Sequence, residues 1–238
     1  MTNLKPEISI CLPTRGRPLQ LSTMIKTATE LATNAKDIEF LIYVDEDDLT
    51  MVDFSHPNAT ILRGERLTIS KMTNLLASIS QGNLIMYAAD DIIFRTKNWD
   101  SIVLQHYNNS AHKICLIHGD DLGQDSNKIA THGFVSRDLY NLLGYLLPTY
   151  FSADFCDTWM TEICVKSSTR SFDPNLIIEH IHPAWGKADI DETYRSTKLS
   201  SYLMNLFRYK ILWGIRNSTT RKIRNYCAAL TTKDSNSV

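Results

Sequence analysis

Short apolar runs that alternate with helical patterns constrain the fold of this chain more than any other feature. Three of the runs are typical of buried strands: Glu7–Leu12 (EISICL), Glu39–Val44 (EFLIYV) and Asn83–Ala89 (NLIMYAA). Helical patterns over Leu19–Leu31 and Ile69–Ser80 stand between them. Strands that alternate with helices predict an α/β fold with a mostly parallel central sheet flanked by helices.

The pattern changes from Lys113 onward, where shorter strand and loop pieces (ICLIHGDD and ATHGFVS) follow one another. Further helices are expected over Asp138–Leu147 and Asp154–Val165, and a last strand over Ile177–His182, before Pro183. We expect this second half of the chain to bind an acceptor substrate and the first half to bind a nucleotide ligand.

Length and composition favour a single large domain. With 238 residues and 43% hydrophobic content, the chain suffices for one sizeable α/β domain, expected over residues 1–194 with halves at 1–112 and 113–194. The sequence has no basic leader before an apolar core and no run of about 18 apolar residues. Its five cysteines form no CxxC pair, so neither a disulfide framework nor a zinc cluster is indicated. We therefore expect a cytoplasmic protein.

The C-terminal segment, residues 195–238, is predicted to be helical and differs in charge from the rest. Residues 1–194 hold 16 Lys and Arg against 25 Asp and Glu, whereas residues 195–233 hold nine basic and no acidic residues. Apolar residues lie between these positive charges. Such a segment can cover the acidic domain of its own chain or make a peripheral contact with an anionic membrane surface, and both interpretations stay open.

Asp90 and Asp91 follow a predicted buried strand. Two adjacent carboxylates repel each other unless a cation or solvent relieves the repulsion. Mg²⁺ and Mn²⁺ prefer oxygen ligands and are commonly held by one or two carboxylates together with substrate phosphates. We therefore interpret the pair as a site for Mn²⁺ or Mg²⁺; the alternative is that Asp91 caps the next element and Asp90 is solvated.

Two polar loops at strand ends are candidates for nucleotide binding. Arg15 and Arg17 follow the first strand and can pair with diphosphate oxygens. Asp45 and Asp47 end the second strand, where a carboxylate can accept hydrogen bonds from a ribose or a base. The sequence contains neither GxGxxG nor GxxxxGK[ST], which argues against a dinucleotide-dependent dehydrogenase and a P-loop NTPase.

Two histidines lie on the last predicted strand. His180 and His182 are two residues apart and share a face of that strand, so one of them can reach a metal at the sheet edge. We take His182 as the metal-ligand candidate and His180 as supporting structure; a hydrogen-bonded structural histidine is the alternative for His182.

Asp154 and Asp157 lie near a predicted helix start, where the helix dipole favours an ionised carboxylate. Either can serve as a general base that removes a proton from an attacking hydroxyl. Asp154 can alternatively be only the helix cap. Trp159 beside them is either a stacking surface for a sugar or a core residue.

Three segments, SICLPTRGRP, IYVDEDD and SKMTNLLASISQGNLIMYAADD, resemble family 2 glycosyltransferases of GT-A fold. The resemblance covers roughly residues 7–194. It departs from the family pattern at Ala88, which stands where the first acidic residue of a D-x-D-D motif is usual. The usual Glu-Asp base motif is replaced by Asp154 and Asp157.

The resemblance implies a role for each matching position. Nucleotide-sugar binding is assigned to the loop after the first strand, to the acidic loop after the second strand and to the helix that precedes the aspartate pair. Metal binding is assigned to the aspartate pair and the histidine further along the chain. One of two later aspartates is the general base. The nucleotide-sugar set is Pro13, Thr14, Arg15, Arg17, Asp45, Asp47, Lys71, Asn74 and Asp90; the metal set is Asp90, Asp91 and His182; the catalytic set is Asp157 and Asp154.

The expected activity is a metal-dependent, inverting transfer of a sugar from a UDP- or GDP-type donor to a glycan or another hydroxyl acceptor, without a nucleic-acid partner. Two alternatives remain. A nucleotidyltransferase also uses metal-bound carboxylates on an α/β sheet but releases pyrophosphate from a nucleoside triphosphate. A non-catalytic module that only binds a sugar nucleotide or a glycan would be consistent with the alanine at position 88.

Overall fold

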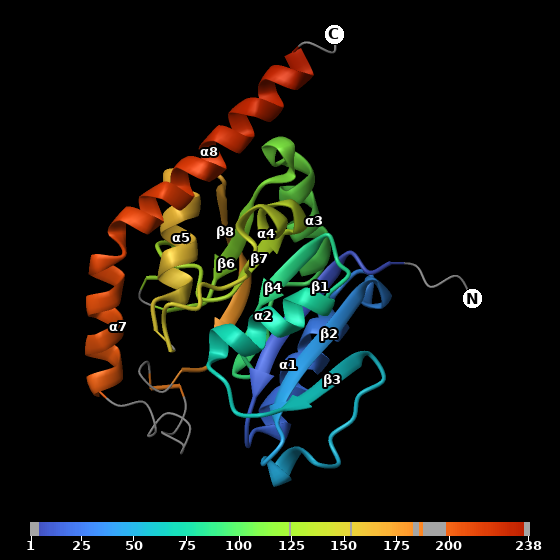
Figure 1. Ribbon diagram of the computed structural model, residues 1–238. Coiled ribbons are helices and arrows are strands. Elements are labelled where there is room, and N and C mark those ends of the chain that lie inside the picture. The colour runs from blue at the N-terminus through green and yellow to red at the C-terminus, as the bar shows by residue number, and fades with distance from the viewer. Residues whose placement is uncertain (1–4, 124, 153, 183–185, 188–198, 236–238) are drawn as a thin grey trace.

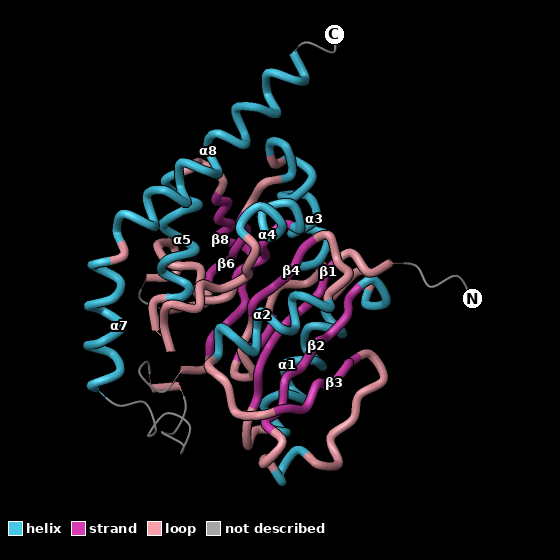
Figure 2. The backbone as a smooth tube through the Cα atoms, viewed as in Figure 1, coloured by secondary structure: helices cyan, strands magenta, loops and turns pink. Residues whose placement is uncertain are grey.

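The computed structural model describes residues 5–123, 125–152, 154–182, 186–187 and 199–235. Within them the strands are β1 (Ile8–Thr14), β2 (Ile38–Asp45), β3 (Ala59–Gly64), β4 (Leu84–Tyr87), β5 (Ile92–Phe94), β6 (Leu116–Asp120), β7 (Gly133–Ser136) and β8 (Arg170–His180). The α-helices are α1 (Pro18–Leu31), α2 (Ile69–Ile79), α3 (Trp99–Asn109), α4 (Arg137–Leu143), α5 (Cys156–Lys166), α7 (Leu199–Ile211) and α8 (Trp213–Ser235). Figures 1 and 2 show the strands as a central layer between helices.

The strands form a single sheet in the order β3-β2-β1-β4-β7-β6-β8-β5. The expectation of a mostly parallel sheet is wrong, because the sheet is mixed. β3, β2, β1 and β4 run parallel, but β7 is antiparallel to both β4 and β6, and β5 is antiparallel to β8. The described part of the connection between β6 and β7 forms turns and no crossover helix, so the chain returns in the opposite direction.

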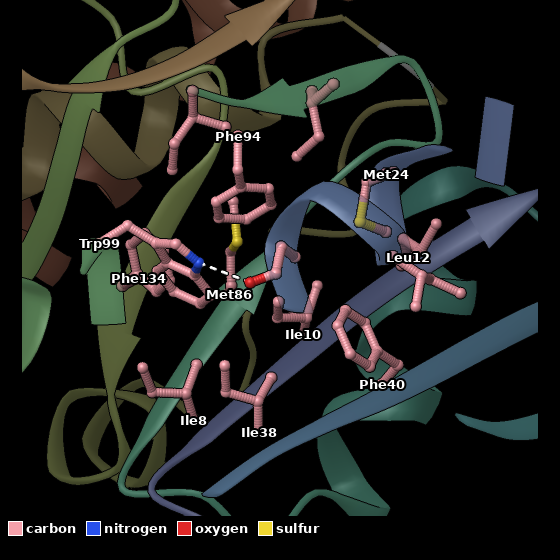
Figure 3. Packing of buried hydrophobic residues seen from close by; sticks show 14 of the residues in the cluster. Ile8, Ile10, Leu12, Met24, Ile38, Phe40, Met86, Phe94, Trp99 and Phe134 are labelled. Atoms are coloured by element: carbon pink, nitrogen blue, oxygen red, sulfur yellow. Dashed lines mark hydrogen bonds between the residues drawn. The ribbon is translucent and has the colours of Figure 1, made fainter. Parts of the chain in front are cut away.

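One face of the sheet packs on α1 and α3. Alternate residues of β1 (Ile8, Ile10 and Leu12) point to this face, as the period of two in a strand requires. Figure 3 shows Trp99 of α3 beside Phe94 and Phe134, and its indole Nε1 donates a hydrogen bond to the carbonyl of Ala28 in α1 over 2.8 Å. Since that N–H is satisfied, the largest side chain of this core is buried without leaving a polar group unpaired.

The opposite face packs on α2, α4, α5 and α8. Cys11 of β1 and Tyr87 of β4 point to this side and meet Leu76 of α2 and Trp159 of α5. Strands β1, β2 and β4 are therefore covered on both faces, which explains why their sequences read as nearly continuous apolar runs. The core on each side fixes the strand ends, where the polar loops begin.

The basic C-terminal segment forms two helices, α7 and α8, which run beside α5 (Figure 1). Ile223 of α8 is buried in the core, and Lys222 and Arg224 donate hydrogen bonds to the carbonyls of Leu142 and Lys166 near the ends of α4 and α5. Cations at helix C-termini are favourable because the carbonyls there carry partial negative charge. No helix in the described ranges combines the length and the apolar character that crossing a bilayer requires. The boundary expected between residues 194 and 195 lies outside the described residues.

Candidate active site

A cleft opens where β1, β2 and β4 end. In open α/β sheets the crevice outside the carboxyl ends of the strands is the usual place for a ligand. The cleft is lined by residues from the loops after these strands, from the start of α2 and from the end of β8: Pro13, Thr14, Arg15, Arg17, Asp45, Ile69, Met72, Ala88, Ala89, Asp90, Asp91, His180 and His182.

The loop after β1 is tied to the loop after β2. Arg15 Nη1 donates hydrogen bonds to Asp45 Oδ2 over 3.0 Å and to Asp47 Oδ1 over 2.5 Å, and Nη2 reaches Asp47 Oδ2 over 3.1 Å. The backbone N–H of Gly16 donates to Asp48 Oδ2 over 2.7 Å, and a φ of +70° at this position favours glycine. Asp48 also accepts from Thr50, so its carboxylate links both loops. These contacts hold the arginine at the edge of the cleft.

Asp45 is the buried acceptor of this cleft. Its Oδ2 atom faces two guanidinium groups, Arg15 at 3.0 Å and Arg66 at 3.6 Å. Its Oδ1 atom is buried and finds no hydrogen-bond partner anywhere in the described parts of the chain. A buried carboxylate oxygen without a donor is unfavourable, so this atom fits a ligand hydroxyl or N–H as its donor.

Asp90 is held by groups of the protein itself. Thr14 Oγ1 donates to Asp90 Oδ2 over 2.7 Å, and Arg17 Nη1 donates to Asp90 Oδ1 over 2.9 Å. Burial raises the pKa of Asp90 above its ordinary value, and the charge of Arg17 and the hydroxyl of Thr14 act against that rise. The guanidinium also lies 3.6 Å from Asp91 Oδ2. The cation that relieves the repulsion between the two aspartates in this structure is therefore an arginine.

Pairing between β5 and β8 brings Asp91 to the histidines. The register places Ile92 opposite His180, and the N–H of Ile181 donates to the carbonyl of Asp91 over 2.8 Å. As a result His180 Nε2 lies 3.3 Å from Asp91 Oδ1. The ring of His182 packs edge-on against that of His180, with 4.9 Å between the centroids.

Two imidazoles near Asp91, those of His182 and His132, have lowered pKa values. Burial lowers the pKa of His182, and the neighbouring His180 lowers it further, whereas Asp91 acts in the other direction. His132 packs edge-on against His180 with 4.7 Å between centroids, and burial lowers its pKa to about 3. Neutral imidazole is the form that binds a metal.

The side chains of the cleft fit a divalent ion only if a bound substrate supplies further ligands. Among the described residues no group of three or more His, Cys, Asp and Glu side chains is placed to hold a metal. Asp91 and His182 line the same cleft, and Mg²⁺ or Mn²⁺ is usually bound by few protein ligands plus substrate phosphates. Asp90 fits less well, because both of its oxygens accept hydrogen bonds from the protein.

Six of the nine residues expected to bind the nucleotide sugar line the cleft, and Asp47 contacts one of them, Arg15. Lys71 and Asn74 do not line the cleft. The residues of α2 that do line the cleft are Ile69 and Met72. Asn74 lies on another side of the helix, where its amide exchanges hydrogen bonds with the backbone of residues 146–147.

The two base candidates do not line the cleft either. Asp157 is in the first turn of α5, its Oδ1 accepts from the N–H of Thr158 over 2.6 Å, and burial raises its pKa. Asp154 has a buried Oδ2 atom without a hydrogen-bond partner in the described parts of the chain. Trp159 is fully buried and donates to Tyr145, so it is a core residue and no stacking surface.

Two groups at this edge were not anticipated. His132 precedes β7, and Asp121 follows β6, where its carboxylate accepts from Gly123 and Thr131. The backbone N–H of His180 donates to the carbonyl of Asp121 over 3.0 Å. The available signal was the HGDD motif after an apolar run, which repeats the pattern of YAADD at the end of β4.

Comparison with known proteins was made by sequence and by structure. No model of a protein family matches the sequence, and no curated protein sequence matches it. Among solved structures, the mannosyltransferase PcManGT from Pyrobaculum calidifontis, in complex with GDP-Man and Mn²⁺, is similar with a TM-score of 0.61 and 11% identity, over 95% of this chain and 87% of that one. S. aureus TarS 1–349 is similar both with UDP and without it, with a TM-score of 0.56 and 9% identity, over 72% of this chain and 59% of that one.

These similarities establish the fold. The chain has a glycosyltransferase fold of the GT-A-like kind, with a mixed sheet. Membership of family 2 stays a prediction, since no family model matches.

Proposed function

We propose that the protein is a glycosyltransferase that moves a sugar from a nucleotide diphosphate donor to an acceptor hydroxyl. The observation that carries the proposal is the buried Oδ1 atom of Asp45, a hydrogen-bond acceptor without a donor. The same cleft contains two arginines, Arg15 and Arg17, and Asp91 with its neighbouring histidines. A nucleotide sugar supplies the groups that such a cleft lacks. Its ribose or base donates to the carboxylate, and its diphosphate carries the negative charge.

Asp45 and the arginines around it account for nucleotide binding in this proposal. Asp45 is held in place by Arg15 and Arg66, which leave one carboxylate oxygen for the ligand. Arg15 and Arg66 beside Asp45 offer guanidinium groups that can pair with the oxygens of a diphosphate. A UDP- or GDP-type donor is supported by the ligands named for the similar structures, GDP-Man and UDP.

Asp91 and His182 are the residues that would hold a divalent ion together with the donor phosphates. The ion would stabilise the charge that develops on the leaving diphosphate. Asp90, Thr14 and Arg17 have a different task in this proposal: they fix the loop after β4 relative to the loop after β1, and Arg17 adds a positive charge beside Asp91. Mn²⁺ in the similar mannosyltransferase supports the choice of ion.

Asp157 is our candidate for the general base of an inverting reaction, and Asp154 is the alternative. The base removes the proton of the acceptor hydroxyl as that oxygen attacks the anomeric carbon. Burial raises the pKa of Asp157, which brings a carboxyl group closer to the pH at which general bases work best. After burial, its charge also contributes to the raised pKa of Tyr87, the last residue of β4.

Product analysis tests the proposed reaction class. Purified protein is incubated with Mn²⁺ and each of several nucleotide sugars, with simple sugars or water as acceptors, and the released nucleotide is identified. A glycosyltransferase releases a nucleoside diphosphate. Release of pyrophosphate from a nucleoside triphosphate and a sugar phosphate would instead indicate a nucleotidyltransferase, and nucleotide binding without any turnover would indicate a non-catalytic binding module.

A further inference from the structure

Helix α7 has two faces of different character. One face packs on the domain: Asn205 is fully buried and donates from Nδ2 to Ser152 Oγ over 3.1 Å. On the same side Tyr202 and Tyr209 pack against the ring of Phe155, and the hydroxyl of Tyr209 donates to Glu162. This face holds the helix to the protein and leaves the other face to the surroundings.

The other face of α7 is a row of exposed large apolar side chains. Leu203, Met204, Phe207 and Ile211 are each more than half exposed. Residues three and four positions apart lie on the same side of a helix, so these four form a continuous apolar surface. Together these four residues are called the α7 face below.

Positive charges border the α7 face on both sides. Arg208 lies next to Met204 and Ile211 in the helical repeat, and Lys210 lies next to Leu203 and Phe207. Both basic residues are exposed, and residues 195–233 contain no acidic residue. Lys222 and Arg224 of α8 donate to carbonyls at the ends of α4 and α5. Arg208 and Lys210 of α7 border the exposed apolar surface, and Arg208 Nη1 also donates to the carbonyl of Tyr150 over 3.4 Å.

We propose that the α7 face binds an anionic lipid bilayer, with the helix lying in the plane of the interface. An apolar helix face bordered by Lys or Arg and containing Phe and Leu is the pattern of an interfacial helix. Anionic headgroups complement the charges at its borders. A second copy of the chain is a weaker match, because a symmetric dimer through this face would bring Arg208 and Lys210 of both copies together. The proposal is independent of the activity proposed above.

Flotation of the full-length protein with vesicles tests this proposal. We expect the protein to float with vesicles of phosphatidylcholine and phosphatidylglycerol and to stay behind with phosphatidylcholine alone. Raising the salt concentration from about 0.1 M to about 1 M should weaken binding, because the screening length falls from about 10 Å to about 3 Å. Failure to bind anionic vesicles at low salt would overturn the proposal.

Two pairs of variants separate the apolar and the charged contributions. Phe207→Asp with Ile211→Asp should reduce vesicle binding at least about tenfold, because the inserted side chains become charged. The matched control is Leu75→Asp with Ile79→Asp, two exposed apolar residues with the same spacing on α2, which should bind as wild type does. Equal losses in both pairs would contradict an α7-specific surface. Circular dichroism shows whether each variant is folded.

Arg208→Gln with Lys210→Gln should weaken binding roughly 20- to 30-fold, since each basic residue near an anionic surface contributes about 1 kcal/mol. Lys26→Gln with Lys128→Gln makes the same change in net charge elsewhere and should have little effect. Sedimentation velocity tests whether a second copy of the chain covers the α7 face instead. If wild type does not bind vesicles but forms a dimer, and the Phe207→Asp with Ile211→Asp variant is a monomer, the face is a dimer interface.

Discussion

Arg17 and Asp90 form a buried ion pair across the ends of two neighbouring strands. Nη1 of the arginine donates to Oδ1 of the aspartate over 2.9 Å, and the two side chains are only 10% and 6% exposed. Thr14, the last residue of β1, completes the arrangement through its hydroxyl. This pair joins the loop after β1 to the loop after β4 and so determines the shape of the candidate cleft.

Removal of either Arg17 or Asp90 alone should therefore reduce the stability of the fold. We expect Arg17→Met to lower the free energy of unfolding by about 3 to 5 kcal/mol, because it leaves a buried carboxylate without its counter-ion. The double variant Arg17→Met with Asp90→Leu should recover much of that loss. Urea denaturation of the single and double variants measures both. If Arg17→Met lowers the free energy of unfolding by less than about 1 kcal/mol, the effect is that of an exposed ion pair, and the description of Arg17 and Asp90 as a buried pair is contradicted.

Asn74 should be important for stability and unimportant for nucleotide affinity. Its amide accepts from the N–H groups of Leu146 and Leu147 over 2.8 and 2.9 Å and donates to the carbonyl of Leu147 over 2.7 Å. We expect Asn74→Ala to cost at least about 1 to 3 kcal/mol, the penalty for leaving a buried backbone group unpaired. Lys71→Ala, on the exposed side of the same helix, is the control for thermal melts and nucleotide titrations. Weaker nucleotide binding by a folded Asn74→Ala protein would return Asn74 to the binding site.

Sequence patterns predicted the elements that carry the cleft. Glu7–Leu12, Glu39–Val44 and Asn83–Ala89 correspond to β1, β2 and β4, because strands buried on both faces need unbroken apolar runs. Strands β3 and β5 were not expected. β5 is apolar but only three residues long, and β3 is partly exposed, so neither forms an apolar run as long as those of β1, β2 and β4.

The contacts of the candidate site that local patterns did not predict are made between residues far apart in the sequence. Which group neutralises Asp90 depends on how the loop after β1 folds, and no local pattern shows that Arg17 points to this carboxylate instead of to solvent. The contact between Asp91 and His180 depends on the antiparallel pairing of β5 with β8, nearly 90 residues apart in the chain. For the same reason the sequence favoured Asn74 for a ligand, although its partners lie in a loop about 70 residues away.

Asp157→Asn should reduce turnover without weakening donor binding. An amide cannot accept the acceptor proton, so we expect a loss of at least about 100-fold in kcat, in the range for removal of a general base. Asp154→Asn should lose less. Asp138→Asn, an exposed aspartate in the first turn of α4, is the matched control. Full activity in a folded Asp157→Asn protein would place the base elsewhere.

His118 should make the protein less stable in mild acid. Burial, and then the charge of Arg170, lower the pKa of this imidazole from 6.5 to about 4, and its Nε2 accepts from Arg170 Nε over 2.8 Å. Between these two pKa values the unfolded chain binds the proton and the folded chain does not. Stability is therefore complete above pH 6.5 and falls as the pH is lowered toward 4.

The size of the loss in unfolding free energy follows from the difference between the two pKa values of His118. About 1.4 kcal/mol for each pKa unit gives a contribution of roughly 3 kcal/mol over the window. We expect His118→Gln to show a flatter dependence of unfolding free energy on pH than wild type, with His56→Gln as the control at a partly exposed histidine. Parallel curves for wild type and His118→Gln would show that this imidazole does not titrate as described.

Calorimetric titration of UDP, GDP, CDP and TDP, with Mn²⁺ and then with EDTA, tests the central claim most directly. We predict that at least one nucleotide binds in the presence of Mn²⁺ and that EDTA abolishes binding. Asp45→Asn and Asp91→Asn should each weaken binding by at least about tenfold, the value of roughly one lost hydrogen bond to a charged group. No binding of any nucleotide, or binding that is equal with EDTA and in Asp91→Asn, would contradict the assignment of this cleft to a metal-dependent nucleotide site.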